Sequence, residues 1–364
     1  MRGSLLKKMV NAALVTGSVL VGLAAVEIFF RLADLPEAPP EKQYVNFFQS
    51  LQKLPHPFYP GYDGKIIAYN YYIYRPGAVW ATAYPDNPRG YFDADNRVYY
   101  QCNAQGFRDR EFTDKKRDAF RIIAIGDSFT MGEGVRAEDT YPRLLEKRLN
   151  ARGVKADVYN LGVNGHGIRD EMVTLTTALD RYHPDMILWG YVLNDISHAM
   201  FDQWVIQMNR DRRRILVTDS PFLFFNYLQR RLWKWYESLS YMDFVRNMYE
   251  RPDFVRDLEA LFAKAGSAAS DAGIPVLVII FPDLDALQKD SYPFAMIHKQ
   301  LSDMFDRLGI PWIDLTRLYK NNDPATLKVH PVDGHPNEKA QALAADSIDA
   351  WLEKHPSLLL YHTP

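Results

Sequence analysis

The chain has 364 residues, 47% of them hydrophobic, which is enough for one large domain or two smaller ones with a substantial core. Its 43 Lys and Arg residues nearly balance its 45 Asp and Glu residues, which argues against a nucleic-acid partner, because such a partner requires a strongly basic face. The single cysteine, Cys102, excludes an internal disulfide and a multi-cysteine zinc site.

The first predicted element is a membrane-spanning helix. Residues 9–30 form an apolar run in which Glu27 is the only charge, and the run is longer than the about 7–15 apolar residues of a signal peptide. Arg2, Lys7 and Lys8 precede the run, and acidic residues outnumber basic ones just after it. The positive-inside rule therefore places the N-terminus in the cytoplasm and the rest of the chain in the periplasm or outside the cell. A cleaved signal peptide and a buried soluble helix are the alternatives.

The anchor, assigned to residues 1–33, is followed by a segment rich in proline and aromatic residues. Six prolines within residues 34–60 predict an extended linker. The Tyr- and Trp-rich residues 61–117 predict short strands and turns that either cover the main domain or line a binding groove. We therefore expect a linker and accessory region over residues 34–117 and the main domain over residues 118–364.

The main domain alternates apolar strands with helices. Strands are expected to begin near Arg121, Asp157, Met186, Ile274 and Pro311, and helices to occupy residues 138–152, 169–182, 254–272, 294–308 and 337–354. Apolar strands that alternate with helices indicate a five-stranded parallel sheet covered on both faces. Because crossovers between parallel strands are right-handed, the expected fold is a doubly wound α/β sandwich.

A long insertion at about residues 197–251 interrupts this alternation. It is aromatic and basic, with partly helical spacing. Its length favours a function, either as a lid over a site or as an amphipathic patch resting on the membrane. A helical pair packed on the edge of the sheet is the structural alternative.

Polar residues follow the strands at the sheet edge where open α/β folds bind ligands. Ser128 follows the first strand, Gly165 the second and Asn194 the third, and Asp333 and His335 follow the fifth. They supply what acyl transfer needs, with Ser128 as nucleophile, His335 as general base and Asp333 to orient the imidazole. The backbone N–H groups of Ser128 and Gly165 and the amide of Asn194 can hold the oxyanion.

In this order, the motifs resemble those of the SGNH hydrolase superfamily, also called GDSL esterases and lipases. The similar blocks are GDSFT at residues 126–130, NLGVNG at 160–165, Asn194-Asp195 and DGHPN at 333–337. The resemblance implies a flavodoxin-like sandwich and hydrolysis of ester bonds without a metal or another cofactor. It also gives Gly165 and Asn194 the oxyanion positions.

Two positions depart from that family pattern. Val192 stands where a glycine usually precedes the asparagine by two residues, and Asp333 and His335 are two rather than three residues apart. The closer spacing is similar to that of SGNH-like proteins working on exopolysaccharide acetylation, some of which are membrane-anchored. His330 is an alternative general base.

The sequence thus predicts a membrane-anchored serine esterase that cleaves acyl esters, in particular acetyl esters, of a carbohydrate or lipid outside the cytoplasm. One alternative is an O-acetyltransferase that uses the same triad on an extracytoplasmic glycan, and another is a catalytically silent carbohydrate-binding protein. Three further classes fit poorly. The glycines of residues 162–167 lack the dinucleotide-binding order, Asp127, Asp333 and His335 are too few for a metal-dependent phosphoesterase, and the G-x-S-x-G elbow of α/β-hydrolases is absent.

Overall fold

The computed structural model describes residues 2–33, 41–60, 66–115, 119–216 and 220–359. They divide into two compact units, one of residues 1–41 and 203–241 and one of residues 42–202 and 242–364. The helices α6 (His198–Ile215) and α7 (Leu223–Glu250) have residues in both units.

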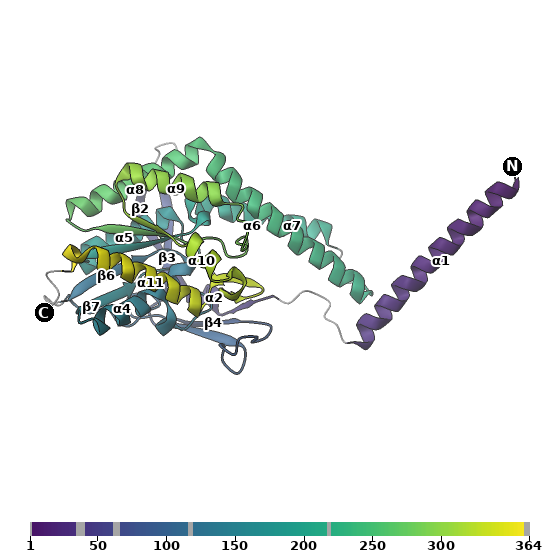
Figure 1. Ribbon diagram of the computed structural model, residues 1–364, viewed down its shortest axis with the longest axis horizontal. Coiled ribbons are helices and arrows are strands. Elements are labelled where there is room, and N and C mark those ends of the chain that lie inside the picture. The colour runs from purple at the N-terminus through teal and green to yellow at the C-terminus, as the bar shows by residue number, and fades with distance from the viewer. Residues whose placement is uncertain (1, 34–40, 61–65, 116–118, 217–219, 360–364) are drawn as a thin grey trace. The chain divides into compact units, whose positions relative to one another are not determined.

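The larger unit is built on a five-stranded parallel sheet with the strand order β10-β9-β8-β6-β7 (Figure 1). Its strands are β6 (Phe120–Ile125), β7 (Ala156–Asn160), β8 (Met186–Tyr191), β9 (Val276–Ile280) and β10 (Trp312–Asp314). Every residue of β6, β8 and β9 is buried, and apart from Arg121 these strands read as apolar runs. Counted along the chain, the order is 2-1-3-4-5 read from the other edge, which is the flavodoxin-like arrangement and confirms the predicted fold class.

Helices cover both faces of this sheet (Figure 1). One face carries α4 (Tyr141–Ala151) and α11 (Glu338–Lys354), which contact each other. The other carries α5 (Ile168–Tyr182), α8 (Pro252–Asp271) and α9 (Ala295–Leu308), of which α8 contacts both others. All five helices lie within a few residues of their predicted places. The shorter elements are α3 (Ser128–Met131), η1 (Ala137–Asp139), η2 (Leu193–Ile196), α10 (Thr316–Asn321), η3 (Pro324–Thr326), η4 (Pro356–Leu358) and a hairpin of β11 (Lys328–His330) and β12 (Asp333–Pro336).

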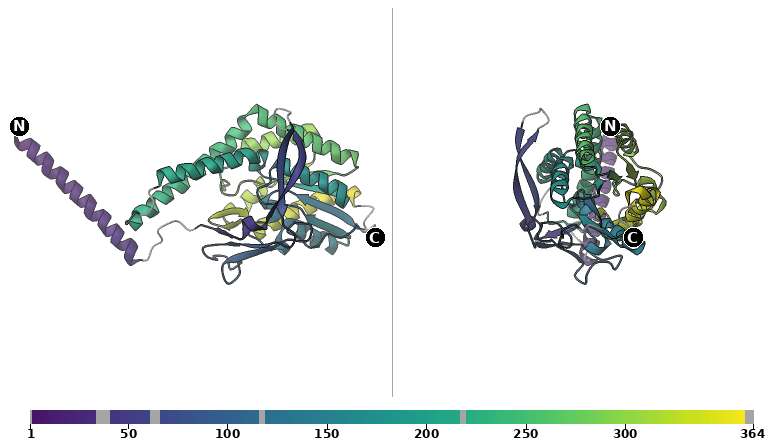
Figure 2. Two further views of the ribbon diagram at one scale, coloured as in Figure 1. Left: turned by 180° about the vertical axis from the view of Figure 1, so that it is seen from behind. Right: turned by 90° about the vertical axis from the view of Figure 1, so that its left-hand side faces the viewer.

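The accessory region contributes two antiparallel sheets to the same unit. The first has the order β1-β4-β5 and contains β1 (Gln43–Val45), β4 (Val79–Ala83) and β5 (Arg97–Gln101). The second is a hairpin of β2 (Leu51–Pro60) and β3 (Ile66–Tyr74), which follows the short helix α2 (Phe47–Ser50) (Figure 2). The ring of Trp80 stacks between Tyr74 and Tyr100, at centroid distances of 4.4 and 5.1 Å, and all three are buried. These aromatic residues therefore form a core and do not line an open groove.

The predicted linker is too long. Pro36, Pro39 and Pro40 lie outside the described residues, but the chain forms secondary structure from Gln43 onward, and the last three prolines of the segment fall within β2. Among the described residues, strand β2 pairs only with β3, so its other edge carries no ladder of hydrogen bonds to them, and proline is tolerated at such an edge because its missing N–H is not needed.

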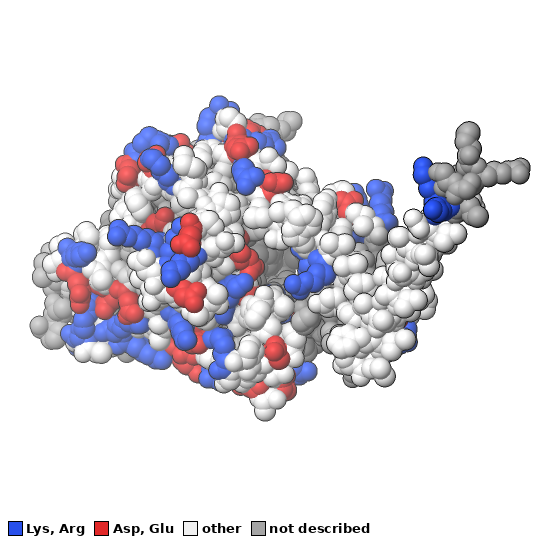
Figure 3. Space-filling model, turned by 45° about the vertical axis from the view of Figure 1, so that its right-hand side comes forward, with Lys and Arg blue, Asp and Glu red and all other residues white. Residues whose placement is uncertain are grey.

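The smaller unit contains α1 (Arg2–Leu32) and most of α6 and α7, the two helices that form the predicted insertion. Among the described residues, one helix is long and apolar enough to cross a membrane, over Lys7–Leu32. Its surface carries almost no charge, whereas basic and acidic side chains mix over the rest of the face seen in Figure 3. Large apolar side chains are exposed along α7 at intervals of three or four residues, at Phe225, Leu228, Leu232, Trp235 and Leu239.

The one acidic residue of the apolar run caps another helix. The carboxylate of Glu27 accepts hydrogen bonds from the N–H groups of Leu223 and Phe224, both at 3.0 Å, at the beginning of α7. Arg31 donates to Glu27 at 2.9 Å and to the carbonyl of Pro221. The first N–H groups of a helix have no partner within it, so the carboxylate satisfies two of them and also meets the positive end of the helix dipole.

Candidate active site

Three of the predicted site residues lie in neighbouring turns at the carboxyl edge of the sheet. Ser128 is the first residue of α3, directly after β6. Gly165 lies in the turn after β7, and Asn194 lies in η2 after β8. Because β6 pairs with both β7 and β8, these turns flank the one that carries Ser128.

The remaining two residues reach Ser128 from a distant part of the chain. His335 Nε2 lies 2.9 Å from Ser128 Oγ, and His335 Nδ1 lies 2.5 Å from Asp333 Oδ1. A carboxylate can only accept, so Nδ1 carries the proton and donates to Asp333, which leaves Nε2 of the neutral ring to accept from the serine hydroxyl. The three side chains thus form a continuous hydrogen-bonded chain from hydroxyl to imidazole to carboxylate.

The two-residue spacing of Asp333 and His335 fits the backbone of this segment. Both lie on β12, where alternate side chains point to the same side. The next residue but one, Asn337, holds the hairpin in place, because its amide donates to the carbonyls of Thr326 and Lys328 while its oxygen caps α11. The spacing therefore leaves the histidine and the carboxylate in direct contact.

Asp127 shapes the turn before the serine. Its carboxylate accepts from the N–H of Phe129 at 2.8 Å, which caps α3, and its other oxygen lies 3.2 Å from Ser128 Oγ. Burial raises the pKa of Asp127 to about 6, against the opposing effects of the Phe129 N–H and the charge of His335. The serine hydroxyl is thus placed between His335 and a buried carboxyl group.

The second oxygen of Asp333 has two partners that sequence reasoning missed. Tyr84 donates its hydroxyl to Oδ2 at 2.8 Å, and the ammonium of Lys42 lies 3.0 Å from the same atom. Burial alone would raise the pKa of Asp333, but the charges of His335 and Lys42 and their hydrogen bonds outweigh burial and hold this pKa well below its usual range. Asp333 is therefore a carboxylate at neutral pH.

Lys42 also interacts with a second buried carboxylate besides Asp333. Glu133 is fully buried and accepts hydrogen bonds from Thr82 and from the side chain of Asn164, both at 2.7 Å. Burial would lower the pKa of Lys42, but the charges of Asp333 and Glu133 raise it well above its usual range. The ammonium of Lys42 is therefore charged and interacts with two acidic residues.

The two predicted oxyanion donors on the neighbouring turns have no acceptor among the described residues. The N–H of Gly165 and the side-chain amide of Asn194 donate to no backbone or side-chain atom of the described chain. Gly165 has a φ of +74°, a conformation that glycine adopts without strain. Val192 is extended, with a φ of −120°, and its N–H donates to Asp195 at 2.7 Å, so the turn before Asn194 does not require glycine at this position.

The alternative base, His330, faces another group. Its Nε2 lies 2.6 Å from Asp86 Oδ1, and its Nδ1 accepts from the N–H of Val332 at 3.2 Å. Both ring nitrogens are therefore engaged away from Ser128, and the geometry favours His335 as its partner.

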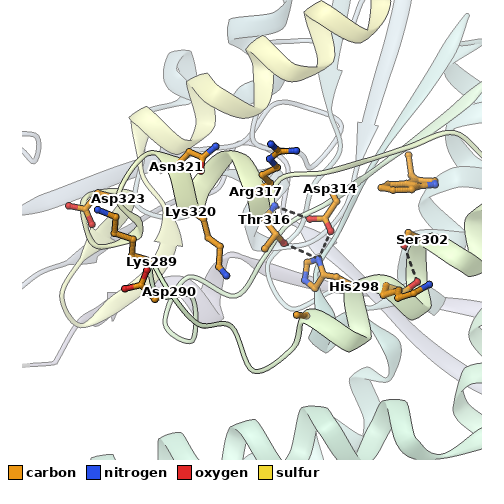
Figure 4. A pocket seen from close by; sticks show the side chains of 13 residues that line it. Lys289, Asp290, His298, Ser302, Asp314, Thr316, Arg317, Lys320, Asn321 and Asp323 are labelled. Atoms are coloured by element: carbon orange, nitrogen blue, oxygen red, sulfur yellow. Dashed lines mark hydrogen bonds and ion pairs between the residues drawn. The ribbon is translucent and has the colours of Figure 1, made fainter.

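The cavity of Figure 4 lies elsewhere in the larger unit and contains none of the predicted site residues. It has a volume of about 960 Å³ and is lined by side chains of α9, β10 and α10 together with Lys289, Asp290 and Asp323. The buried His298 in its wall shares Nδ1 between Asp314 and Thr316, each at 3.1 Å, and its Nε2 lies 3.1 Å from the hydroxyl of Tyr292. Because neither nitrogen is open to a ligand, His298 stabilises the wall of the cavity. In the described part of the chain, no group of three or more His, Cys, Asp or Glu side chains could hold a metal ion.

Comparison with known families agrees with the family that the sequence motifs resemble. Residues 124–343 match the model of the GDSL-like lipase/acylhydrolase family, which covers more than half of the chain. The chain belongs to this family, whose members are acylhydrolases.

Individual relatives are more distant. A curated arylesterase from Vibrio mimicus is 28% identical over 100 residues, which are 28% of this chain and 50% of that protein. The chain thus spans about half the length of that relative. The psychrotrophic esterase EstA from Pseudoalteromonas sp. is 14% identical with a TM-score of 0.41, covering 65% of this chain and 99% of that one. The lipase/acylhydrolase from Enterococcus faecalis is 17% identical with a TM-score of 0.41, covering 65% and 96%.

Proposed function

We propose that this protein is a membrane-anchored serine esterase whose nucleophile is Ser128. The observation that carries the proposal is the hydrogen-bonded chain from Ser128 through His335 to Asp333, at 2.9 and 2.5 Å. Membership of an acylhydrolase family supports the same reaction class.

In the proposed mechanism, Ser128 Oγ attacks the ester carbonyl while its proton passes to His335 Nε2. The charge of Asp333 stabilises the imidazolium that forms. The carbonyl oxygen becomes an oxyanion, which the N–H groups of Ser128 and Gly165 and the amide of Asn194 stabilise, and each such donor contributes about 10²–10³-fold in rate. The bond to the alcohol oxygen then breaks as His335 returns the proton to it.

A water molecule completes the cycle. It attacks the acyl-serine carbonyl and gives its proton to His335, and collapse of the second tetrahedral intermediate releases the carboxylic acid and restores the Ser128 hydroxyl. Two of the donors that this scheme assigns to the oxyanion, the N–H of Gly165 and the amide of Asn194, have no acceptor among the described residues, which supports their role.

We further propose that the substrate is an acyl ester, in particular an acetyl ester, of a carbohydrate or lipid outside the cytoplasm. The apolar helix over Lys7–Leu32 and the basic residues Lys7 and Lys8 at its beginning support an anchor with the N-terminus inside. Exposed apolar side chains along α7 favour a substrate at or near a membrane surface.

The test compares Ser128→Ala with Ser302→Ala, which removes a hydroxyl that lines the other cavity and bonds to the carbonyl of Lys299. We expect Ser128→Ala to abolish hydrolysis of p-nitrophenyl acetate and labelling by a fluorophosphonate, and Ser302→Ala to retain both. Full turnover by a folded Ser128→Ala variant would refute the assignment. A panel of acetylated xylan, acetylated monosaccharides and esters of short and long acyl chains then defines the substrate. Protease digestion of intact cells and of spheroplasts tests the location of the main domain.

A further inference from the structure

We propose that Lys42, from the accessory region, is a positioning residue of the esterase site that fixes Asp333 and offsets part of its charge, and so sets the pH range in which His335 works as a base. This inference rests on the proposed function. It assigns to the segment directly after the membrane anchor a part in the chemistry of a site almost 300 residues further along the chain.

Strand pairing explains why Lys42 and Tyr84 meet at one atom. The last pair of the antiparallel β1–β4 ladder is Gln43 with Ala83. Lys42, directly before β1, and Tyr84, directly after β4, are therefore the next residues beyond this pair. Both extend to Asp333 Oδ2, at 3.0 and 2.8 Å, while Oδ1 accepts the hydrogen bond from Nδ1–H of the His335 ring. The end of an accessory sheet therefore holds the carboxylate on the side opposite the imidazole.

The ion pair of Lys42 and Asp333 is more buried than the ion pairs on the surface of the protein. The side chain of Asp333 is 1% exposed and that of Lys42 is 19% exposed, whereas the helical pair of Lys299 and Asp303 is 63% and 50% exposed. Water screens an exposed pair almost completely, but a pair shielded from water interacts strongly with its neighbours. A change at Lys42 is therefore felt at His335, which lies on the other side of the same carboxylate.

The charged groups around His335 act in two directions. Asp333 and Asp127 are acidic and favour the protonated imidazole, and the charge of Lys42 opposes it across Asp333. Glu133 faces Lys42 and reduces the positive charge that Lys42 exerts. Tyr84 is neutral, because burial raises its pKa well above the usual value.

The other ionisable side chains near β12 have partners of their own. Lys328 lies 3.0 Å from Asp285, whose carboxylate also approaches Gly334, and His330 lies 2.6 Å from Asp86. Lys42 is thus the cation in direct contact with Asp333 besides His335. Without its charge, the imidazolium is stabilised more, and the general base is lost to protonation at a higher pH.

Charge and hydrogen bonding can be separated by four variants. Lys42→Gln keeps a donor for Asp333 but removes the charge, whereas Lys42→Arg keeps the charge. Tyr84→Phe removes the other donor to Oδ2 and leaves the charges unaltered. Lys115→Gln is the control, because the side chain of Lys115 is 26% exposed, against 19% for Lys42, and pairs with Asp185 at 2.5 Å. Asp185 directly precedes β8, so this pair lies at the end of that strand away from the site.

The measurement is the pH dependence of kcat/KM for p-nitrophenyl acetate and of the rate at which a fluorophosphonate labels Ser128, with thermal unfolding to verify the fold. We expect the acid limb of both profiles to move upward by roughly one pH unit in Lys42→Gln. The limb should stay in place in Lys42→Arg and Lys115→Gln. Tyr84→Phe should lower the rate roughly 10- to 100-fold without moving the limb, since it removes a hydrogen bond to a charged group.

The outcomes distinguish this inference from the proposed function. Suppose that the fluorophosphonate labels Ser128 of the unaltered protein, and that the acid limb of its pH profile coincides with that of Lys42→Gln. The inference is then wrong and the esterase assignment stands. An equal upward shift in Tyr84→Phe also overturns it, because the effect would then come from displacement of Asp333 and not from charge. If the unaltered protein is neither labelled nor active, the proposed function itself fails. Should Lys42→Gln not fold, a shifted limb in Lys42→Arg overturns the inference and an unshifted one supports it.

Discussion

Replacement of Asp333 by asparagine keeps the shape of the side chain and removes its charge. In the native protein, this carboxylate accepts from His335 at 2.5 Å and from Tyr84 at 2.8 Å, and pairs with Lys42 at 3.0 Å. The variant leaves the imidazolium of the transition state without a counter-charge, and the amide can also turn its NH₂ group toward His335 and select the wrong tautomer. We expect kcat/KM to fall by about 10⁴-fold, which corresponds to about 5 kcal/mol of transition-state stabilisation.

The same substitution tests the stability of the buried charges. It leaves the ammonium of Lys42 with Glu133 as its remaining acidic neighbour, and loss of one partner of a buried ion pair costs about 3–5 kcal/mol. Because the pKa of Asp333 is lowered by folding, its contribution to stability is present above pH 4 and disappears as the pH falls further. The difference in unfolding free energy between the two proteins should therefore be largest at neutral pH and shrink in acid.

The assays are steady-state hydrolysis of p-nitrophenyl acetate and urea unfolding between pH 3 and 8. Asp303→Asn serves as control, because Asp303 forms an exposed pair with Lys299 at 2.7 Å, and both measurements should stay unchanged. A folded Asp333→Asn protein that keeps more than about a tenth of the native kcat/KM would refute the role given to this carboxylate, since a lost counter-charge costs far more than tenfold.

Two further substitutions test the surroundings of the serine. Gly134 has a φ of +77°, and an added Cβ would collide with Val329 and with the hydroxyl of Tyr84, so Gly134→Ala should lower the unfolding free energy by about 2–4 kcal/mol and reduce activity. Gly153→Ala, at φ +84° in open space, should cost about 1 kcal/mol and leave activity intact; equal effects on activity would contradict the collision with Tyr84. Burial raises the pKa of Asp127 to about 6, so its neutral form is favoured by folding and the native stability should fall by about 2–3 kcal/mol as the pH rises from 4 to 6. Asp127→Asn should remove this fall in urea unfolding curves, and a persisting fall would assign it to another group.

The sequence was most informative for residues whose position in space follows from the order of strands and helices along the chain. The strands were predicted from their apolar runs, because every residue of β6, β8 and β9 is buried and Arg121 is the one charged residue among them, and the amphipathic helices followed from residues such as Leu145 and Leu149. Once the strands were in order, the turns that carry Ser128, Gly165 and Asn194 had to lie at one edge. The roles of these residues in catalysis stay predictions.

The accessory region could not be placed in this way. Its strands pair antiparallel with irregular spacing, and even β5, whose residues alternate between buried and exposed, has the sequence RVYYQ, in which no regular alternation of apolar and polar residues marks the buried face. The contact of Lys42 and Tyr84 with Asp333 depends on the register of β1 and β4 and on the docking of their sheet against β12, neither of which leaves a local signal. The prolines of β2 are typical of a linker, but they fit in this strand because hydrogen bonds to β3 are formed along one of its edges.

The cap that Glu27 forms on α7 gives the apolar helix a second property besides its hydrophobicity. A transmembrane segment taken from an unrelated protein would match its length and apolar character, but it would leave the N–H groups of Leu223 and Phe224 without their acceptor. The first helix and the insertion therefore have to be exchanged together, and an isolated swap would keep an apolar helix of the same length while releasing the end of α7.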